Sequence, residues 1–439
     1  EAARRVGRPV RWVSERIEDF HSSTQGRDNR ATLRLALDAE HNILALEARV
    51  LSNMGAYLST NGPLAPTTAF ASAMGGVYAI PAIDIEVRGV FTNTVPIDAY
   101  RGAGKPEANY IIERTIDIAA ARLGVDPVGL RRHNMMRDAP HRNATGMQID
   151  GGRFGLNLED ALRRADQAGF PARREASARA GLLRGLGFGC FLETARGAPN
   201  EVASIRMEPD GSIVFAVGTQ SNGQGHETSY AQVAASMLGL PVDRFRFRQG
   251  DTVLLPGGGG HGGARSLQLG GTALVLAVEA MVAKGCSIAA HLLQARPEEI
   301  GFRDGAFQHR SDGRALPLDD IAAASRDPAN LPEGLTPGLD GMGQNISDLY
   351  AFPNGCHVAE VEIDPETGSV RLCRYTLVDD YGTLVNPRLA LGQVQGGVAQ
   401  GIGQAMLEHA AYDAATGQFL TGSLMDYALP RASDLPDFD

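Results

Sequence analysis

The sequence predicts a mixed α+β protein built from two lobes. Its 439 residues are too many for one ordinary domain, because single hydrophobic cores stop growing at roughly 250–300 residues. Apolar and polar residues alternate over short stretches, which is typical of half-buried β-strands. Longer stretches with helical spacing follow glycine-rich turns. The strand and helix patterns recur along the whole chain and favour both kinds of element in each lobe.

The first expected lobe opens with a β-hairpin and continues to a long helix. Residues 32–38 and 41–50 alternate as two strands. Residues 106–123 have helical spacing, with Pro106 at the start, where no N–H is needed, and Gly124 at the end. The loop at 101–104 should therefore lie at a helix N-terminus.

A change of pattern after the first lobe predicts the domain division. We expect residues 1–145 to form the C-terminal part of a first domain, residues 146–180 to connect, and residues 181–439 to form a second domain that continues further. The second domain is expected to begin with the glycine-rich run at 185–190, to contain a strand and turn within 203–217 and strands at 358–363 and 370–378, and to have helices at 228–238, 272–294 and 389–409.

Composition excludes several classes of function. The net charge of -10 comes without a clustered stripe of Lys and Arg, which disfavours nucleic-acid binding. We see no apolar run of about 18 residues and no signal sequence, so we expect no membrane span and a cytoplasmic protein. The four cysteines form no C-x-x-C pair, so neither a disulfide framework nor a zinc or iron–sulfur site is expected.

Glycine is the informative excess, with 53 residues. Four glycine-flanked polar clusters stand where a strand passes into a helix, at 101–104, 223–228, 262–266 and 392–396. Backbone N–H groups at such junctions attract anions. None of the four fits a Walker A loop or a dinucleotide-binding fingerprint. One such loop alone is best explained as a tight turn, but four predict a phosphate-bearing ligand held by separate loops.

Five segments together resemble the molybdopterin-binding subunits of the xanthine dehydrogenase, aldehyde oxidase and carbon monoxide dehydrogenase family. The resemblance covers essentially the whole chain and implies the two-lobed molybdenum-cofactor-binding fold of that family. It rests on the residues at 99–108, 218–228, 262–266, 378–387 and 392–403.

The resemblance also implies which residues contact the cofactor, while no side chain is expected to bind the metal. Arg101 would lie beside the metal and the pterin dithiolene, and Ala103 would line the substrate pocket. The remaining contacts would come from Gly223, Gln224, Gly225, His226 and Thr228 at the pyrophosphate and pterin, from Gly263, Ala264, Arg265 and Ser266 over the metal and phosphates, and from Asp380, Asn386 and Gln393.

The implied activity is that of a molybdenum hydroxylase, which oxidises an aldehyde or an N-heterocycle with oxygen derived from water. The implied cofactor is molybdopterin cytosine dinucleotide with molybdenum. Electrons would pass to an iron–sulfur small subunit with a 2Fe-2S cluster and to a medium subunit with FAD, in a dimer of heterotrimers. The family's catalytic glutamate lies in a Gly-Glu-Ala-Gly or Gly-Glu-Pro-Pro segment that this sequence lacks. We therefore name no catalytic residue here, expect that glutamate beyond Asp439, and expect the chain to be an internal piece.

Departures from the family pattern bear on the substrate. Members that oxidise carbon monoxide carry a reactive cysteine directly after the loop arginine, whereas this chain has Gly102. Purine-oxidising members place a stacking phenylalanine at the position of Ala103, which offers no aromatic face. These two residues argue against carbon monoxide and xanthine.

Two other interpretations of the sequence compete with a cofactor-binding subunit. The chain could be a structural piece, or half of a split subunit, with no cofactor and no activity of its own. A hydrolase built on Cys356 and His357 is disfavoured, because neighbouring side chains on a strand point to opposite faces. We expect Cys356 to be a core residue.

Overall fold

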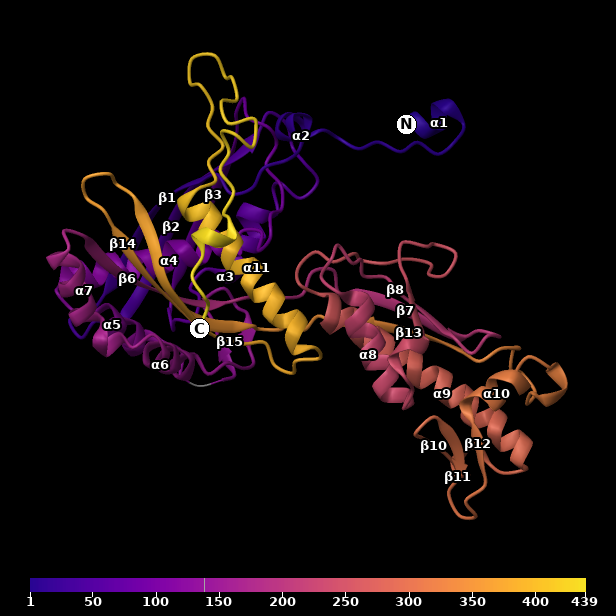
Figure 1. Cartoon of the computed structure of the whole chain (residues 1–439). Coiled ribbons are helices and arrows are strands. Elements are labelled where there is room, and N and C mark those ends of the chain that lie inside the picture. The colour runs from indigo at the N-terminus through magenta and orange to yellow at the C-terminus, as the bar shows by residue number, and fades with distance from the viewer. Residues whose placement is uncertain (138) are drawn as a thin grey trace. The chain divides into compact units, whose positions relative to one another are not determined.

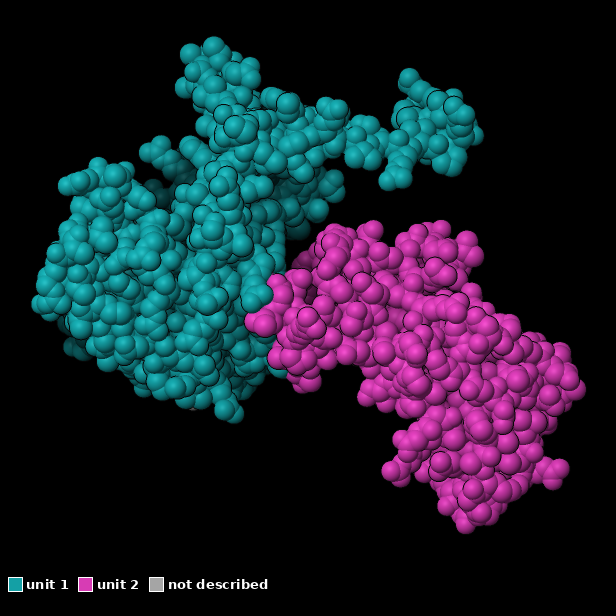
Figure 2. All heavy atoms as spheres, in the orientation of Figure 1, with its two compact units in different colours: residues 1–194, 352–382, 394–439 teal, residues 195–351, 383–393 magenta. Residues whose placement is uncertain are grey.

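The computed structural model describes residues 1–137 and 139–439. Within them the chain forms two compact units, coloured separately in Figure 2. Unit 1 comprises residues 1–194, 352–382 and 394–439, and unit 2 comprises residues 195–351 and 383–393. Compact units reflect packing and need not follow sequence domains, so the expected domain division at residues 145 and 181 stays a prediction.

Unit 1 combines two three-stranded sheets and one two-stranded sheet with several helices (Figure 1). Its helices are α1 (Ala2–Val6), α2 (Arg16–Ser22), α3 (Phe70–Ala73), α4 (Lys105–Leu123), α5 (Pro127–Asn134), α6 (Phe154–Arg164) and α7 (Phe170–Arg179). Its strands are β1 (Asn29–Leu37), β2 (Ile43–Gly55), β3 (Ile83–Phe91), β4 (His141–Arg142), β5 (Gln148–Ile149), β6 (Leu183–Leu192), β14 (Asn354–Ile363) and β15 (Val370–Asp380).

The two three-stranded sheets of unit 1 have the orders β1-β2-β3 and β15-β14-β6. Strands β1 and β2 are antiparallel neighbours, which confirms the predicted hairpin, and β3 joins β2 in parallel. In the other sheet β14 is antiparallel to both neighbours, and β14 and β15 confirm the two strands predicted around the turn at 364–368.

Helix α4 carries the core of unit 1 and begins at the first glycine loop. It spans Lys105–Leu123 and so confirms the predicted helix, with Gly104 and Gly124 in the left-handed region at its two ends. Its buried apolar residues recur at every fourth position, which puts them on one face. They are Ala108, Ile112, Ile116 and Ala120, and they pack in the main apolar cluster of this unit.

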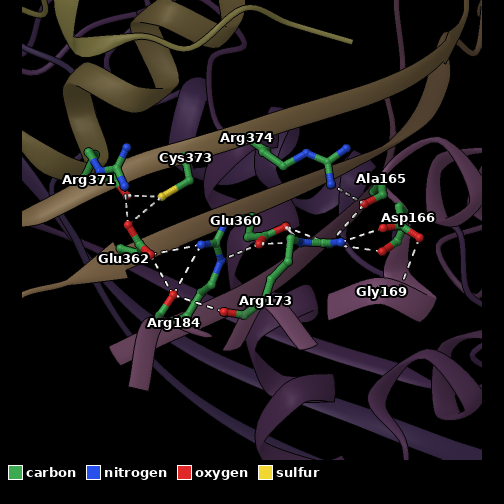
Figure 3. Close-up of polar contacts among 11 residues, drawn as sticks. Ala165, Asp166, Gly169, Arg173, Arg184, Glu360, Glu362, Arg371, Cys373 and Arg374 are labelled. Carbon is green, nitrogen blue, oxygen red and sulfur yellow. Dashed lines mark hydrogen bonds and ion pairs between the residues drawn. The ribbon is translucent and has the colours of Figure 1, made fainter. Parts of the chain in front are cut away.

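A buried ionic cluster ties helix α7 to the sheet β15-β14-β6 (Figure 3). Arg173 and Arg184 both bind the carboxylate of Glu360. Arg184 reaches Glu362 as well, at 2.9 Å, and Arg371 binds the other oxygen of Glu362. Because both carboxylates are saturated by arginines of the same unit, this cluster is a structural network that fixes α7.

Unit 2 is also mixed α+β (Figure 1). Its helices are α8 (His226–Leu238), α9 (Thr272–Leu293) and α10 (Leu318–Ala324), and its strands are β7 (Asn200–Met207), β8 (Ile213–Val217), β9 (Phe245–Arg248), β10 (Ile300–Arg303), β11 (Ala306–His309), β12 (Ala315–Pro317) and β13 (Asp340–Ile346). A further helix, α11 (Pro387–Met406), begins in the last segment of unit 2 and continues along the chain into unit 1.

The main sheet of unit 2 has the order β13-β7-β8-β9, and α9 packs closely on β13. That close approach requires glycine: a Cβ on Gly341 or Gly343 would lie 2.1 Å from a carbonyl oxygen of α9. Helix α9 has the length and composition to cross a membrane, but half of its apolar window is buried in the protein. The predicted helices at 228–238, 272–294 and 389–409 are confirmed within a few residues as α8, α9 and α11.

Candidate functional site

The loop at 101–104 is a strained turn that leads directly into α4. Gly102, Ala103 and Gly104 all have positive φ, at 97°, 40° and 88°. A Cβ on Gly104 would lie 1.9 Å from the carbonyl oxygen of Ala65, so only glycine fits there. The side chain of Lys105 donates to Glu193 and to the carbonyl of Thr194, at 2.8 Å for the carbonyl. Lys105 therefore anchors the end of the loop, in which Ala103 is the residue strained by a left-handed backbone.

The guanidinium of Arg101 faces the glycine-rich part of α11 within unit 1. A Cβ placed on Gly396 or Gly397 would come within 3.6–3.7 Å of it. The carbonyl of Arg101 accepts hydrogen bonds from Arg27 and, at 3.5 Å, from Gln400. Two of the four predicted glycine clusters, 101–104 and 392–396, thus have residues lying together in this unit.

Within unit 2 the glycine loop at 223–228 ends in the N-terminus of α8. Gly223 and Gly225 have positive φ, at 108° and 80°. His226, the first helical residue, is buried, and its Nδ1 has no hydrogen-bond partner among the described residues. Burial lowers the pKa of His226, which favours a neutral imidazole. A neutral ring with an unused nitrogen at a helix N-terminus is suited to a polar or anionic ligand.

Tyr230 connects that helix to the loop at 262–266. Its hydroxyl lies 2.7 Å from Thr219 Oγ1 and donates to the carbonyl of Ser266 at 2.7 Å. The side chain is fully buried, and burial raises the pKa of Tyr230 to about 12, so the hydroxyl keeps its proton at neutral pH. A single phenol thereby fixes the distance between the strand end at Thr219 and the turn at Ser266.

Arg265 is buried and fully engaged inside unit 2. Its Nε donates to the carbonyl of Ala198 at 3.0 Å, and its Nη1 to the carbonyl of Gly260 at 2.9 Å. Its remaining donors bind the carboxylate of Glu201 and the carbonyl of Asn200. The sequence interpretation places Arg265 among the cofactor contacts. In this geometry its side chain holds the loop, and the residue as a whole is not exposed to solvent.

The backbone around Gly263 and Ala264 is exposed and left-handed, with φ of 87° and 56°. Gly263 packs on Gly197, where a Cβ would approach the backbone to 2.6 Å. Ser266 then opens a π-helical turn (Ser266–Gly271) ahead of α9. Such turns recur at functional sites because they leave backbone groups outside the regular ladder.

The other expected contact residues are placed as follows. Asn386 donates to Gln232 of α8 at 2.9 Å and accepts from the N–H of Leu389. The side chain of Leu389 lies against Gly225, so the start of α11 is close to the loop at 223–228. Asp380 accepts the N–H of Gly382 at 2.9 Å in a turn of unit 1.

Three more predicted contact residues are exposed or half-buried on loops and helix starts. Gln224 folds back on its own loop, where its Nε2 donates to the carbonyl of Gln220 at 3.1 Å. Thr228 lies exposed in the first turn of α8, and Gln393 lies exposed on α11. These side chains have access to solvent and hence to a ligand.

The Cys356 and His357 pair does not form a nucleophile and base. Cys356 is buried with its sulfur 3.5 Å from that of Cys190, which confirms its place in the core. His357 points to the other face, with Nδ1 2.9 Å from Tyr375 Oη and Nε2 3.0 Å from Asp379. Among the described residues, no group of three or more His, Cys, Asp or Glu side chains could hold a metal.

The structure therefore assembles two sets of predicted residues. In unit 2 the loops at 223–228 and 262–266 and the start of α11 lie together, and in unit 1 the loop at 101–104 lies on the glycines of α11. The sequence interpretation missed the residues that hold these loops: Arg27, Glu201 and Tyr230. Of these three, only Tyr230 could have been found from the sequence, because it stands four residues after His226 and hence on the same helical face.

A pterin ligand that carries phosphate fits the chemistry of these groups. Donors and acceptors for phosphates and a heterocycle come from the His226 nitrogen that lacks a partner among the described residues, from the exposed left-handed backbone amides and from the amide side chains. No metal-binding side chain is needed if the ligand itself holds the metal.

Comparison with known proteins points independently to a molybdopterin cofactor. Sequence profiles of the molybdopterin cofactor-binding domain match residues 1–135 and 160–436. The carbon monoxide dehydrogenase large chain of Hydrogenophaga pseudoflava is 32% identical over 99% of this chain and 56% of its own length. The nicotine 6-hydroxylase large subunit of Paenarthrobacter nicotinovorans is 32% identical over 100% of this chain and 56% of its own length.

A solved structure shows the same fold. Quinoline 2-oxidoreductase from Pseudomonas putida 86 superposes with a TM-score of 0.92 at 32% identity, covering 100% of this chain and 57% of that chain. This chain thus spans a little over half the length of each of these three relatives.

Proposed function

Because this chain belongs to the molybdopterin-binding subunits of the xanthine dehydrogenase, aldehyde oxidase and carbon monoxide dehydrogenase family, we propose that it provides the cofactor-binding loops of a molybdenum hydroxylase. The observation that carries the proposal is the buried His226 nitrogen, which lacks a partner at the N-terminus of α8. Buried polar groups are nearly always hydrogen-bonded, so this one calls for a ligand.

When bound, the cofactor supplies the two-electron oxidation and the activation of water that hydroxylation needs. The chain's own residues bind and orient it. Gly223, Gln224, Gly225, His226 and Thr228 would contact the pyrophosphate and pterin, Gly263, Ala264, Arg265 and Ser266 would close over the metal and phosphates, and Arg101, Asp380, Asn386 and Gln393 would complete the contacts. We propose the cytosine dinucleotide form.

We propose an N-heterocycle or an aldehyde as substrate. Two relatives are named for N-heterocycles, nicotine and quinoline. At the position where carbon monoxide oxidisers carry a cysteine, a Cβ on Gly102 would lie 2.4 Å from the ring of Pro106. A cysteine would need the loop to rearrange, which supports a substrate other than carbon monoxide. Ala103 offers no aromatic face at the position where purine-oxidising members carry a phenylalanine, which argues against xanthine.

The proposed partners follow from the family to which the chain belongs. We propose that an iron–sulfur small subunit with a 2Fe-2S cluster and a medium subunit with FAD accept the electrons, in a cytoplasmic dimer of heterotrimers.

Metal and nucleotide analysis tests the proposal. Protein purified from its native host should contain about one molybdenum per chain and release cytidine monophosphate on acid hydrolysis. Release of another nucleotide would correct the cofactor form alone. Protein without molybdenum or pterin would instead support the second candidate, a structural piece or half of a split subunit without cofactor.

A further inference from the structure

Arg27 stands between α2 and β1, in a segment where no regular element requires it. Its backbone has a φ of 58°, in the left-handed region that residues with a Cβ rarely adopt. Its side chain is only 6% exposed. A long charged side chain in a strained backbone conformation and out of solvent calls for a specific reason.

The contacts of Arg27 supply that reason. Its Nη2 donates to the carbonyl oxygen of Arg101, and its Nη1 donates to Oε1 of Gln404 on α11. The guanidinium carbon lies 4.6 Å above the centre of the Tyr100 ring. Its Nε lies 3.6 Å from Oε2 of Glu107, in the first turn of α4. One planar group therefore touches the loop at 100–104, the start of α4 and the end of α11, all within unit 1.

This geometry depends on the shape of the guanidinium. It can donate in its plane in several directions while its face stacks on an aromatic ring. The ammonium group of a lysine is a compact point charge and cannot serve the carbonyl, the amide and the ring at once. An arginine at this position is thus matched to a junction of three elements.

Within the described part of the chain, the contacts at this junction also leave two buried polar atoms without hydrogen bonds, which lowers stability. Arg27 Nε and Glu107 Oε2 are buried and have no hydrogen-bond partner among the described residues. Burial lowers the pKa of Arg27 and raises the pKa of Glu107. Unsatisfied buried groups of this kind are often found at functional sites, where a residue keeps its position although this lowers the stability of the fold.

We infer that Arg27 is a positioning residue for the cofactor loop: it fixes the backbone of Arg101 so that the Arg101 guanidinium stays on the Gly396 and Gly397 face of α11. Arg27 acts on the loop through the carbonyl oxygen of Arg101. The side chain expected beside the cofactor is that of Arg101 itself. This inference rests on the proposed function, because that function gives the position of Arg101 its importance.

Amide hydrogen exchange combined with metal analysis tests the inference on protein from the native host. In Arg27→Gln we expect the amides of residues 100–105 to exchange about tenfold faster, as expected for local opening, while the β1 and β2 amides keep their rates. Molybdenum content should fall severalfold. Arg27→Lys should restore part of the protection. The matched control is Arg34→Gln on β1. The side chain of Arg34 is 83% exposed, so this variant should change neither the exchange rates nor the molybdenum content.

Unchanged exchange at residues 100–105 in both Arg27 variants overturns the inference, and so does an equal acceleration in all peptides, which would indicate a general loss of stability. If neither variant accumulates, Gln404→Leu decides, since it removes only one partner of Arg27 and should loosen the same loop. If wild-type protein holds no molybdenum while the loop still responds to Arg27→Gln, the proposed function fails and the anchoring role of Arg27 stands.

Discussion

The guanidinium of Arg265 and the carboxylate of Glu201 form an ion pair in which neither side chain is exposed to solvent. The carboxylate also accepts the N–H of Gly259 at 3.2 Å. Replacing one member of such a pair leaves the other charge buried and uncompensated, which typically destabilises a protein by about 3–5 kcal/mol. We expect Glu201→Gln to reduce the free energy of unfolding by this amount, as measured by urea denaturation.

The matched control for Glu201→Gln is Glu208→Gln, which breaks the ion pair with Arg206 at the end of the same strand. Arg206 is 51% exposed, and exposed pairs contribute only about 0–1 kcal/mol. Equal effects of the two substitutions would show that burial of the Arg265 pair does not govern stability.

Tyr230→Phe removes the hydroxyl that joins Thr219 to Ser266. The change leaves the buried Thr219 hydroxyl and the Ser266 carbonyl without their shared partner, which costs about 1–3 kcal/mol of unfolding free energy. Since the loop at 262–266 loses its tether to α8, molybdenum content should fall as well. Tyr110→Phe on the exposed face of α4 is the control. A variant with full stability and full metal content would contradict the tethering role.

Sequence reasoning found the elements whose pattern is local. The hairpin of β1 and β2 follows from alternation, and α4 follows from Pro106, Gly124 and the four-residue spacing of its apolar face. The glycine loops could be found because left-handed turns at helix starts demand glycine. By contrast, Arg27 and Glu201 meet partners 74 and 64 residues away. No spacing rule links such pairs, so the residues that hold the loops emerge only from the folded chain.

The ionic cluster of Figure 3 predicts a particular pH dependence of stability. Hydrogen bonds from Ser177 and Arg371 lower the pKa of Glu362 to about 2, below the value near 4.3 expected in the unfolded chain. A depressed folded-state pKa contributes stability that is complete above the unfolded value and is lost as the pH falls towards the folded value. Glu362→Gln should therefore lower Tm at pH 6, and its curve should converge with that of wild type near pH 2.

Thermal unfolding between pH 2 and pH 6 provides the measurement. Glu366→Gln, in the exposed turn of the same hairpin, is the control and should follow the wild-type curve throughout. A constant offset between wild type and Glu362→Gln over the whole range would mean that the carboxylate charge contributes nothing at this position.

Arg101→Ala and Gln224→Ala should lower cofactor occupancy while leaving the fold intact, because both side chains are on loops and partly open to solvent. Exposed substitutions usually change the unfolding free energy by less than about 0.5 kcal/mol, so Tm should stay near the wild-type value while molybdenum per chain falls. Arg114→Ala on α4 and Gln344→Ala on β13 remove the same side-chain types from exposed sites away from the glycine loops and should retain full metal. Unchanged molybdenum in both Arg101→Ala and Gln224→Ala would refute their assignment to the cofactor, even if the protein as a whole carried the metal.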